Sequence, residues 1–101
     1  MIKFHFHSAP RDVPALEAGK GDRLCHVYSD VSLEELIEWG TARGLKPDWI
    51  DRRHTLPHFD VRAESVADRE RGVGRAELVR DIRAWQGRTD SQAGQAGPDY
   101  V

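Results

Sequence analysis

The chain contains a single cysteine, Cys25, among its 101 residues. No disulfide can form within it, so a fold stabilised by disulfides is excluded and a cytoplasmic location is favoured. Because free cysteine is usually buried, we expect Cys25 to be a packing residue. Paired cysteines with the spacing of a structural zinc site are absent as well.

Long apolar runs are also missing. No segment approaches the roughly 20 consecutive apolar residues of a membrane-spanning helix, and the amino terminus lacks the apolar stretch of a signal peptide. We therefore expect a cytoplasmic protein with no membrane partner. The formal net charge of −2 gives no overall positive surface for nucleic acid. Arginines gather in the second half of the chain, but acidic residues interleave with them, which favours ion pairs on helix surfaces.

The composition describes one small domain. Hydrophobic residues make up 39% of the chain and charged residues 32%, enough for a modest core. Apolar periodicity is lost after Trp85. We therefore predict a single α/β domain over residues 1–85 and a flexible tail over residues 86–101. Association into an oligomer is compatible with so small a core.

The clearest helix pattern follows Ser32. Ser32 and Glu35 fit a capping box, apolar residues recur at helical spacing after them, and Gly44 fits the left-handed position that ends a helix. This pattern predicts a helix over residues 33–43. Similar apolar spacing predicts two further helices, over residues 63–71 and 75–85.

Alternation of apolar and polar residues predicts strands over residues 2–7 and 24–28, with residues 72–74 as a candidate third. We expect a short, mostly parallel sheet packed against about three helices. His5 and His7 share the polar face of the first strand. Such a pair can chelate a metal ion, or it can be two exposed strand residues, and the spacing alone leaves both interpretations open.

Polar residues follow the second predicted strand, which carries His26. Ser29 and Asp30 stand between this strand and the helix, where free backbone N–H groups can bind an anion. An ordinary strand-to-helix turn would use the same residues. Further along, His58 and Asp60 point to one side if residues 57–61 are extended. A histidine held by a carboxylate serves as a general base or a metal ligand, although a hydrogen-bonded turn can also contain this pair.

The run from Cys25 to Val79 resembles a small bacterial and phage family, the domain of unknown function 4031. The shared features are His26, Ser29-Asp30, Leu33, Leu36, Gly44-Leu45, Trp49, the triplet His58-Phe59-Asp60, Arg69, Gly72 and Glu77-Leu78-Val79. Members usually carry tyrosine where Phe59 stands, and acidic residues where this chain has His7-Ser8. The resemblance implies no reaction. It does imply that four residues converge on one catalytic site: His26, Asp30, His58 and Asp60.

Two functions of different classes are compatible with these residues. The first is a small hydrolase or nucleic-acid-processing enzyme, in which His58 and Asp60 are candidate ligands of a divalent metal such as Zn, Mn or Fe. A small anionic ligand such as phosphate would then contact the helix N-terminus, Ser29 and Arg69. The second is a non-catalytic module that binds protein or nucleic acid. We take the enzyme as the working hypothesis.

Overall fold

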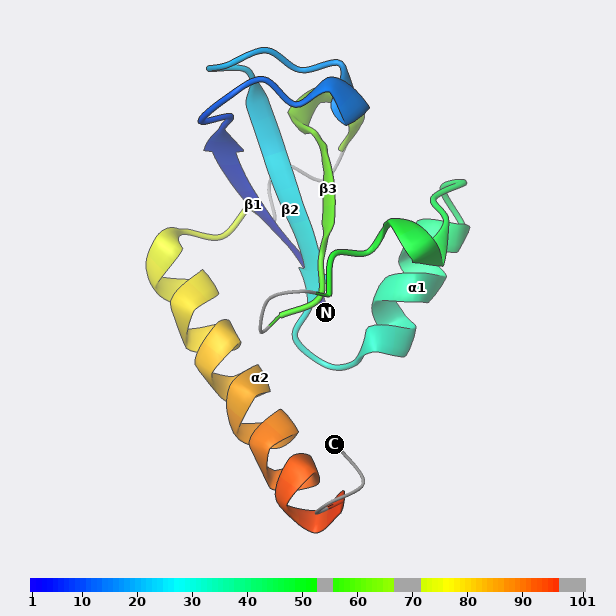
Figure 1. The fold of residues 1–101 in the computed structure, drawn as a ribbon, viewed down its shortest axis with the longest axis vertical. Coiled ribbons are helices and arrows are strands. Elements are labelled where there is room, and N and C mark those ends of the chain that lie inside the picture. The colour runs from blue at the N-terminus through cyan, green and yellow to red at the C-terminus, as the bar shows by residue number, and fades with distance from the viewer. Residues whose placement is uncertain (53–55, 67–71, 97–101) are drawn as a thin grey trace.

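The computed structural model describes residues 1–52, 56–66 and 72–96, the last eight of these as backbone only (Figure 1). The described residues form three strands and two α-helices. These are β1 (Ile2–Ser8), β2 (Arg23–Ser29), α1 (Leu33–Thr41), β3 (Phe59–Arg62) and α2 (Arg75–Ala96). Three short 3₁₀ turns connect them: η1 (Pro14–Leu16), η2 (Pro47–Trp49) and η3 (Ala63–Ser65).

The three strands form one antiparallel sheet in the order β1-β2-β3, so the prediction of a mostly parallel sheet is wrong. Parallel neighbours need a crossover connection, which is usually a helix. Between β1 and β2 the chain makes only the short turn η1 and an isolated bridge from Val13 to Ala18. Residues 9–22 therefore return the chain directly beside β1, and the two strands pair in opposite directions.

The third strand is β3, rather than the predicted residues 72–74. Phe59 and Val61 alternate with polar neighbours, as expected if residues 57–61 are extended, but Pro57 and the shortness of the run argued against counting a strand there. Gly72 makes an isolated parallel bridge to Phe4. Two glycines flank Val73, which leaves one side chain to pack and does not support a longer strand.

Helix α1 begins as the sequence indicates. The Ser32 hydroxyl accepts a hydrogen bond from the N–H of Glu35 at 3.1 Å. Gly44, just beyond the helix, has φ of +80°, a left-handed conformation in which glycine is favoured. The helix ends at Thr41, two residues before the predicted position. This first predicted helix is confirmed, with a small shift of its end.

The other predicted helices differ more from the structure. In the described residues, the segment predicted as a helix over 63–71 contains only η3, and residues 67–71 lie outside the described part. The described part thus has two α-helices instead of about three. Helix α2 continues past Trp85 to Ala96, since no proline interrupts residues 86–96. Neither described helix is both long and apolar enough to cross a membrane.

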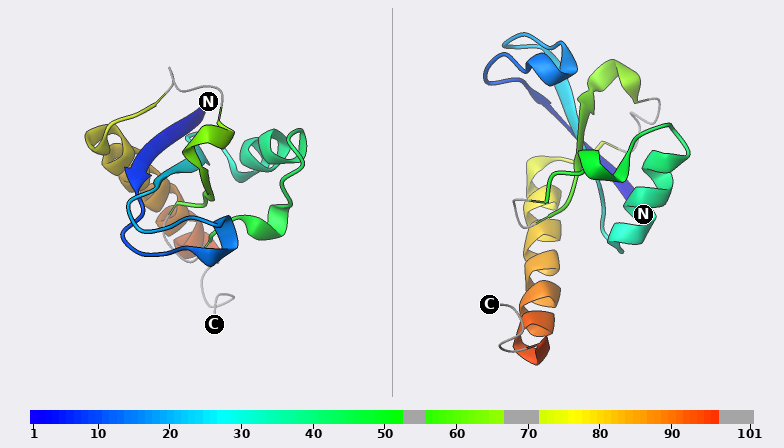
Figure 2. Two further views of the ribbon diagram at one scale, coloured as in Figure 1. Left: turned by 90° about the horizontal axis from the view of Figure 1, so that it is seen from above. Right: turned by 45° about the vertical axis from the view of Figure 1, so that its right-hand side comes forward.

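The sheet has an apolar face and a polar face, and α1 and α2 lie on different sides of it (Figure 2). On the apolar face Phe4, Val27 and Phe59 are at most 2% exposed and pack with Leu36 of α1. Burying a side chain of this size contributes roughly 1.5–3 kcal/mol. Cys25 lies on this face with no exposed surface, and burial raises the pKa of its thiol to about 12. The packing role expected for Cys25 is confirmed.

Helix α1 approaches the sheet most closely at Gly40. A Cβ atom at this position would lie 2.6 Å from two ring atoms of Phe59, closer than side chains tolerate. The contact therefore requires glycine. Phe59 directly precedes Asp60, so the position of α1 also fixes the strand that carries Asp60.

Candidate functional site

The polar face of the sheet gathers imidazoles from β1, from β2 and from His58, the residue just before β3. Strand register places His26 opposite His5 on one side and opposite Asp60 on the other. Facing residues of neighbouring strands have Cβ atoms about 5 Å apart, so alternation brings these side chains together. We call the resulting group the histidine cluster; it consists of His5, His7, His26, His58 and Asp60.

Asp60 joins the two histidines that the sequence singled out. Its Oδ1 atom lies 2.7 Å from Nδ1 of His26 and 3.5 Å from Nε2 of His58. Burial alone would raise the pKa of Asp60, but the hydrogen bonds of His26 and His58 outweigh burial and hold that pKa below its usual value. Asp60 is therefore a carboxylate anion at the centre of the cluster.

His58 is oriented by the backbone. Its Nδ1 atom lies 2.9 Å from the carbonyl oxygen of Leu56, to which an N–H at this position donates. In the neutral ring the lone pair is then on Nε2, the nitrogen on the Asp60 side. Burial alone would lower the pKa of His58, but the contacts with Asp60 and Leu56 raise it overall.

His7 stacks on His26, with ring centroids 4.1 Å apart and planes inclined by 16°. Nδ1 of His7 lies 3.3 Å from the carbonyl oxygen of Ser8, while Nε2 is buried and finds no hydrogen-bond partner among the described residues. Burial and the proximity of His26 lower the pKa of His7, and the same two causes lower the pKa of His5. Both imidazoles are neutral near pH 7, the form that binds metal ions.

Two groups of three side chains in the described residues have metal-ligand spacing. Ligand atoms of His7, His26 and Asp60 all lie within 4.8 Å of one another, and so do those of Asp51, His58 and Asp60. We call these the first and second triads; Asp60 belongs to both. Nitrogen and carboxylate ligands of this kind suit zinc, manganese and iron.

The sequence predicted three of the five residues that make up the two triads: His26, His58 and Asp60. It left the role of His7 open, because only the pairing of β1 with β2 brings this ring against His26. It missed Asp51 altogether. Asp51 becomes a neighbour of His58 through two backbone hydrogen bonds of 2.8 and 3.2 Å across an isolated bridge, and no short motif marks such a contact.

Ser29 and Asp30 do not join the histidine cluster. Asp30 lies four positions after His26 along the chain, a distance of about 13 Å in a strand. The Ser29 hydroxyl donates to Glu35 and accepts from the N–H groups of Val31 and Ser32. Its one donor and both of its acceptor lone pairs are thus occupied within the turn. Arg69, the other predicted anion-binding residue, lies outside the described residues.

Asp30 instead belongs to a second polar group at the opposite end of the same face. We call this group the lysine network; it consists of Lys3, Tyr28, Asp30, Glu77 and Asp81. Nζ of Lys3 lies 2.9 Å from Glu77 and from Asp81, and 3.3 Å from Asp30. The hydroxyl of Tyr28 donates to Asp81 at 2.6 Å. These contacts attach α2 to the sheet.

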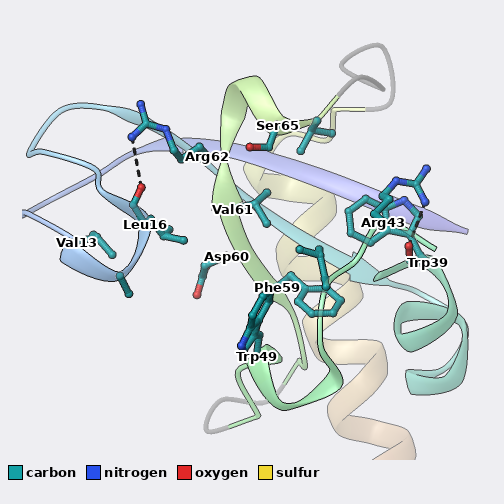
Figure 3. Close-up of a pocket in the computed structure, with 13 residues that line it drawn as sticks. Val13, Leu16, Trp39, Arg43, Trp49, Phe59, Asp60, Val61, Arg62 and Ser65 are labelled. Carbon is teal, nitrogen blue, oxygen red and sulfur yellow. Dashed lines mark hydrogen bonds between the residues drawn. The ribbon is translucent and has the colours of Figure 1, made fainter. Parts of the chain in front are cut away.

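A pocket of about 1080 Å³ opens along the outer side of β3 (Figure 3). Phe59 and Val61 face one side of the strand and Asp60 faces the other, so the pocket is apolar toward α1 and acidic toward the cluster. Trp49 lines it beside Asp60 and is 55% exposed. Asp60 of the cluster is therefore open to a pocket that an exposed aromatic ring also lines.

Fold and site together define a small antiparallel α+β domain with a histidine-rich sheet face. The chain belongs to the family described as "Protein of unknown function (DUF4031)", whose model matches residues 12–84. The resemblance drawn from the sequence is thereby confirmed. The matched range includes Asp51 and His58 and begins after His5 and His7.

One relative is the "Uncharacterized protein YneQ" of the bacterium Bacillus subtilis (strain 168). It is 42% identical to this chain over 33 residues, which is 33% of this chain and 33% of YneQ. The matched stretch thus spans about a third of the relative. No solved structure matches the chain.

Proposed function

We propose that this chain is a small metal-dependent hydrolase whose first triad holds a divalent transition metal ion. The carrying observation is the buried Nε2 of His7, which lacks a hydrogen-bond partner among the described residues while the ligand atoms of His26 and Asp60 lie nearby. A buried acceptor without a partner is costly, and a metal ion would satisfy it.

The number of ligands supports a catalytic ion over a structural one. Structural zinc sites are closed by four protein ligands, whereas catalytic sites have three and keep a position for water. The side chains of His26 and Asp60 are 31% and 39% exposed, which leaves room for that water. A metal ion lowers the pKa of bound water to near 7 and so supplies a nucleophile for hydrolysis.

The proposal leaves out Ser29 and Asp30, whose hydrogen bonds and charge are used elsewhere. It retains the expected cytoplasmic location, where a buried thiol such as Cys25 stays reduced.

Metal titration of the full chain tests the first part of the proposal. After removal of metals by EDTA, calorimetric titration with Zn²⁺ and Mn²⁺ should show binding in the wild type and at least about 100-fold weaker binding in Asp60→Asn. His5→Gln is the matched control, because His5 lies in the cluster but in neither triad. Equal affinity in Asp60→Asn and the wild type would contradict the site.

Hydrolysis tests the second part. We expect the metal-loaded chain to release p-nitrophenol from p-nitrophenyl acetate or p-nitrophenyl phosphate, and Asp60→Asn to lose this activity. Metal binding without hydrolysis of either ester would contradict the enzyme and favour a non-catalytic binding module.

A further inference from the structure

The second triad adjoins the first through Asp60, and a hollow with an exposed tryptophan opens beside it. We infer that Asp60 bridges two divalent metal ions, the second held by His58 and Asp51, and that this pair hydrolyses a phosphoester of a nucleotide seated against Trp49. The inference rests on the proposed function and extends it from one ion to two and from hydrolysis in general to nucleotides.

Backbone hydrogen bonds position two residues of the second triad, as strand pairing positions the first triad. Asp51 and His58 exchange two backbone hydrogen bonds, of 2.8 and 3.2 Å, so their side chains are cross-strand neighbours. The contact of Nδ1 of His58 with the Leu56 carbonyl leaves Nε2 as the coordinating nitrogen. The His58 side chain is 14% exposed, and its ring is thus held in one orientation by its surroundings.

The two triads suit a shared carboxylate. Nδ1 of His26 and Nε2 of His58 approach the same oxygen of Asp60, at 2.7 and 3.5 Å. Their ring centroids are 4.8 Å apart with planes inclined by 80°, so the rings approach Asp60 from different directions. Metal ions in two-metal hydrolases lie about 3.5–4 Å apart, a spacing that one bridging carboxylate can span.

Two-metal sites of this spacing are typical of phosphatases and nucleases, because two ions stabilise both the attacking and the leaving oxygen at phosphorus. In the proposed reaction a water oxygen forms a bond to phosphorus, the phosphorus bond to the ester oxygen breaks, and one proton of the water passes to the leaving oxygen. The products are a phosphate and an alcohol. Water is the only co-reactant.

The surroundings of the second triad favour a nucleotide among phosphoesters. A hollow of about 760 Å³ is lined by Asp51, Asp60, Trp49 and Arg52. Trp49 is 55% exposed, and Nζ of Lys46 lies 5.9 Å from its ring centroid. An exposed tryptophan stacks well on a nucleobase, and nearby arginine and lysine suit its phosphate. Trp49 also lines the larger pocket, so the ring borders both openings to Asp60.

Metal stoichiometry tests the second ion. We expect Mn²⁺ titration of the full chain, followed by electron paramagnetic resonance, to show two ions per chain with the signal of a coupled pair. His58→Gln and Asp51→Asn should each retain one ion and lose the coupling, and His7→Gln should also bind only one. A single ion in the wild type, with His58→Gln unchanged, would overturn the second ion while leaving the proposed function intact. Absence of all Mn²⁺ and Zn²⁺ binding would overturn both.

Kinetics test the substrate. Thymidine 5′-(p-nitrophenyl phosphate) should be hydrolysed to thymidine 5′-phosphate and p-nitrophenol, with methyl p-nitrophenyl phosphate as the control that lacks a base. We expect Trp49→Ala to raise KM for the thymidine ester about 10-fold, since stacking of one base on an aromatic ring contributes an effect of this order. KM for the methyl ester should stay within twofold. Equal changes for both esters, or none, would overturn the assignment of a nucleotide.

Discussion

The polar face of the sheet carries two clusters that differ in how their polar groups are satisfied. In the lysine network the cation of Lys3 contacts three carboxylates, and Tyr28 donates a further hydrogen bond to Asp81. In the histidine cluster two buried ring nitrogens, Nε2 of His7 and Nδ1 of His5, lack partners among the described residues.

The difference separates the structural role of the lysine network from the metal-binding role that we propose for the histidine cluster. A network whose donors and acceptors match fixes the position of α2 and has no need of a ligand. A group of imidazoles around a carboxylate, with two ring nitrogens left without partners among the described residues, has ligand atoms that an added cation would satisfy. Changes in the lysine network should therefore alter stability without metal, and changes in the histidine cluster should alter stability mainly with metal.

The largest effect should come from Lys3→Met. The Lys3 side chain is 12% exposed, and its loss leaves Glu77, Asp81 and Asp30 without their shared cation. Breaking a buried ion pair costs about 3 kcal/mol, so the free energy of unfolding in urea should fall by that order. His5→Gln, at a half-buried position of the same strand, should cost much less. An equal loss in both variants would remove the distinction between the two clusters.

Zn²⁺ should make stability depend on the histidine cluster as well. With free Zn²⁺ at 100 times its dissociation constant, the free energy of unfolding should rise by about 2.7 kcal/mol. Asp60→Asn should lose this gain, because Asp60 is common to both triads, while Lys3→Met should keep it. Thermal unfolding with and without Zn²⁺ measures both. A gain that persists in Asp60→Asn would place the metal elsewhere.

Tyr28→Phe should have an intermediate effect. The variant loses the hydrogen bond to the Asp81 carboxylate and leaves that acceptor with Lys3 alone. A hydrogen bond to a charged group contributes about 1.5 kcal/mol or more, which urea unfolding can resolve. Zn²⁺ binding should be unchanged. Weakened Zn²⁺ binding in Tyr28→Phe would show that the two clusters are coupled.

The smallest effect concerns pH in metal-free protein. The pKa of His7 is lowered on folding, so the unfolded chain gains a proton first as pH falls below about 6.5, and stability falls with pH. His7→Gln should therefore lose less stability between pH 7 and pH 5.5. The pKa of His58 is raised, so its contribution is present at low pH and is lost as pH rises. His58→Gln should change the pH profile in the opposite sense, and profiles of the same sign would refute this assignment.

Local patterns in the sequence identified α1 and the two faces of β1 and β2, because the spacing at which apolar side chains return to one face is set by residues close in the chain. The direction of the strands could not be obtained this way. A period of two is the same in parallel and antiparallel strands, and residues 9–22 are long enough for either connection.

The residues of the candidate site likewise differ in whether local sequence patterns could predict them. His58 and Asp60 could be paired from their spacing in the sequence, whereas the contacts of His7 and Asp51 depend on how separate segments align. Asp30 follows His26 by alternation, but the sequence did not show that Lys3 and α2 would engage it at the far end of the face. Pairing over long sequence distances was thus the missing information.

Gly40 of α1 can affect the candidate site from the opposite face of the sheet. Because the helix rests on the ring of Phe59 at Gly40, a methyl group there would have to displace either the helix or β3. A displacement of β3 would move Asp60 relative to His26 and change the separation of the proposed ligands on the other face of the sheet. Under the proposed function, substitutions in the core would therefore alter metal selectivity with every proposed ligand unchanged.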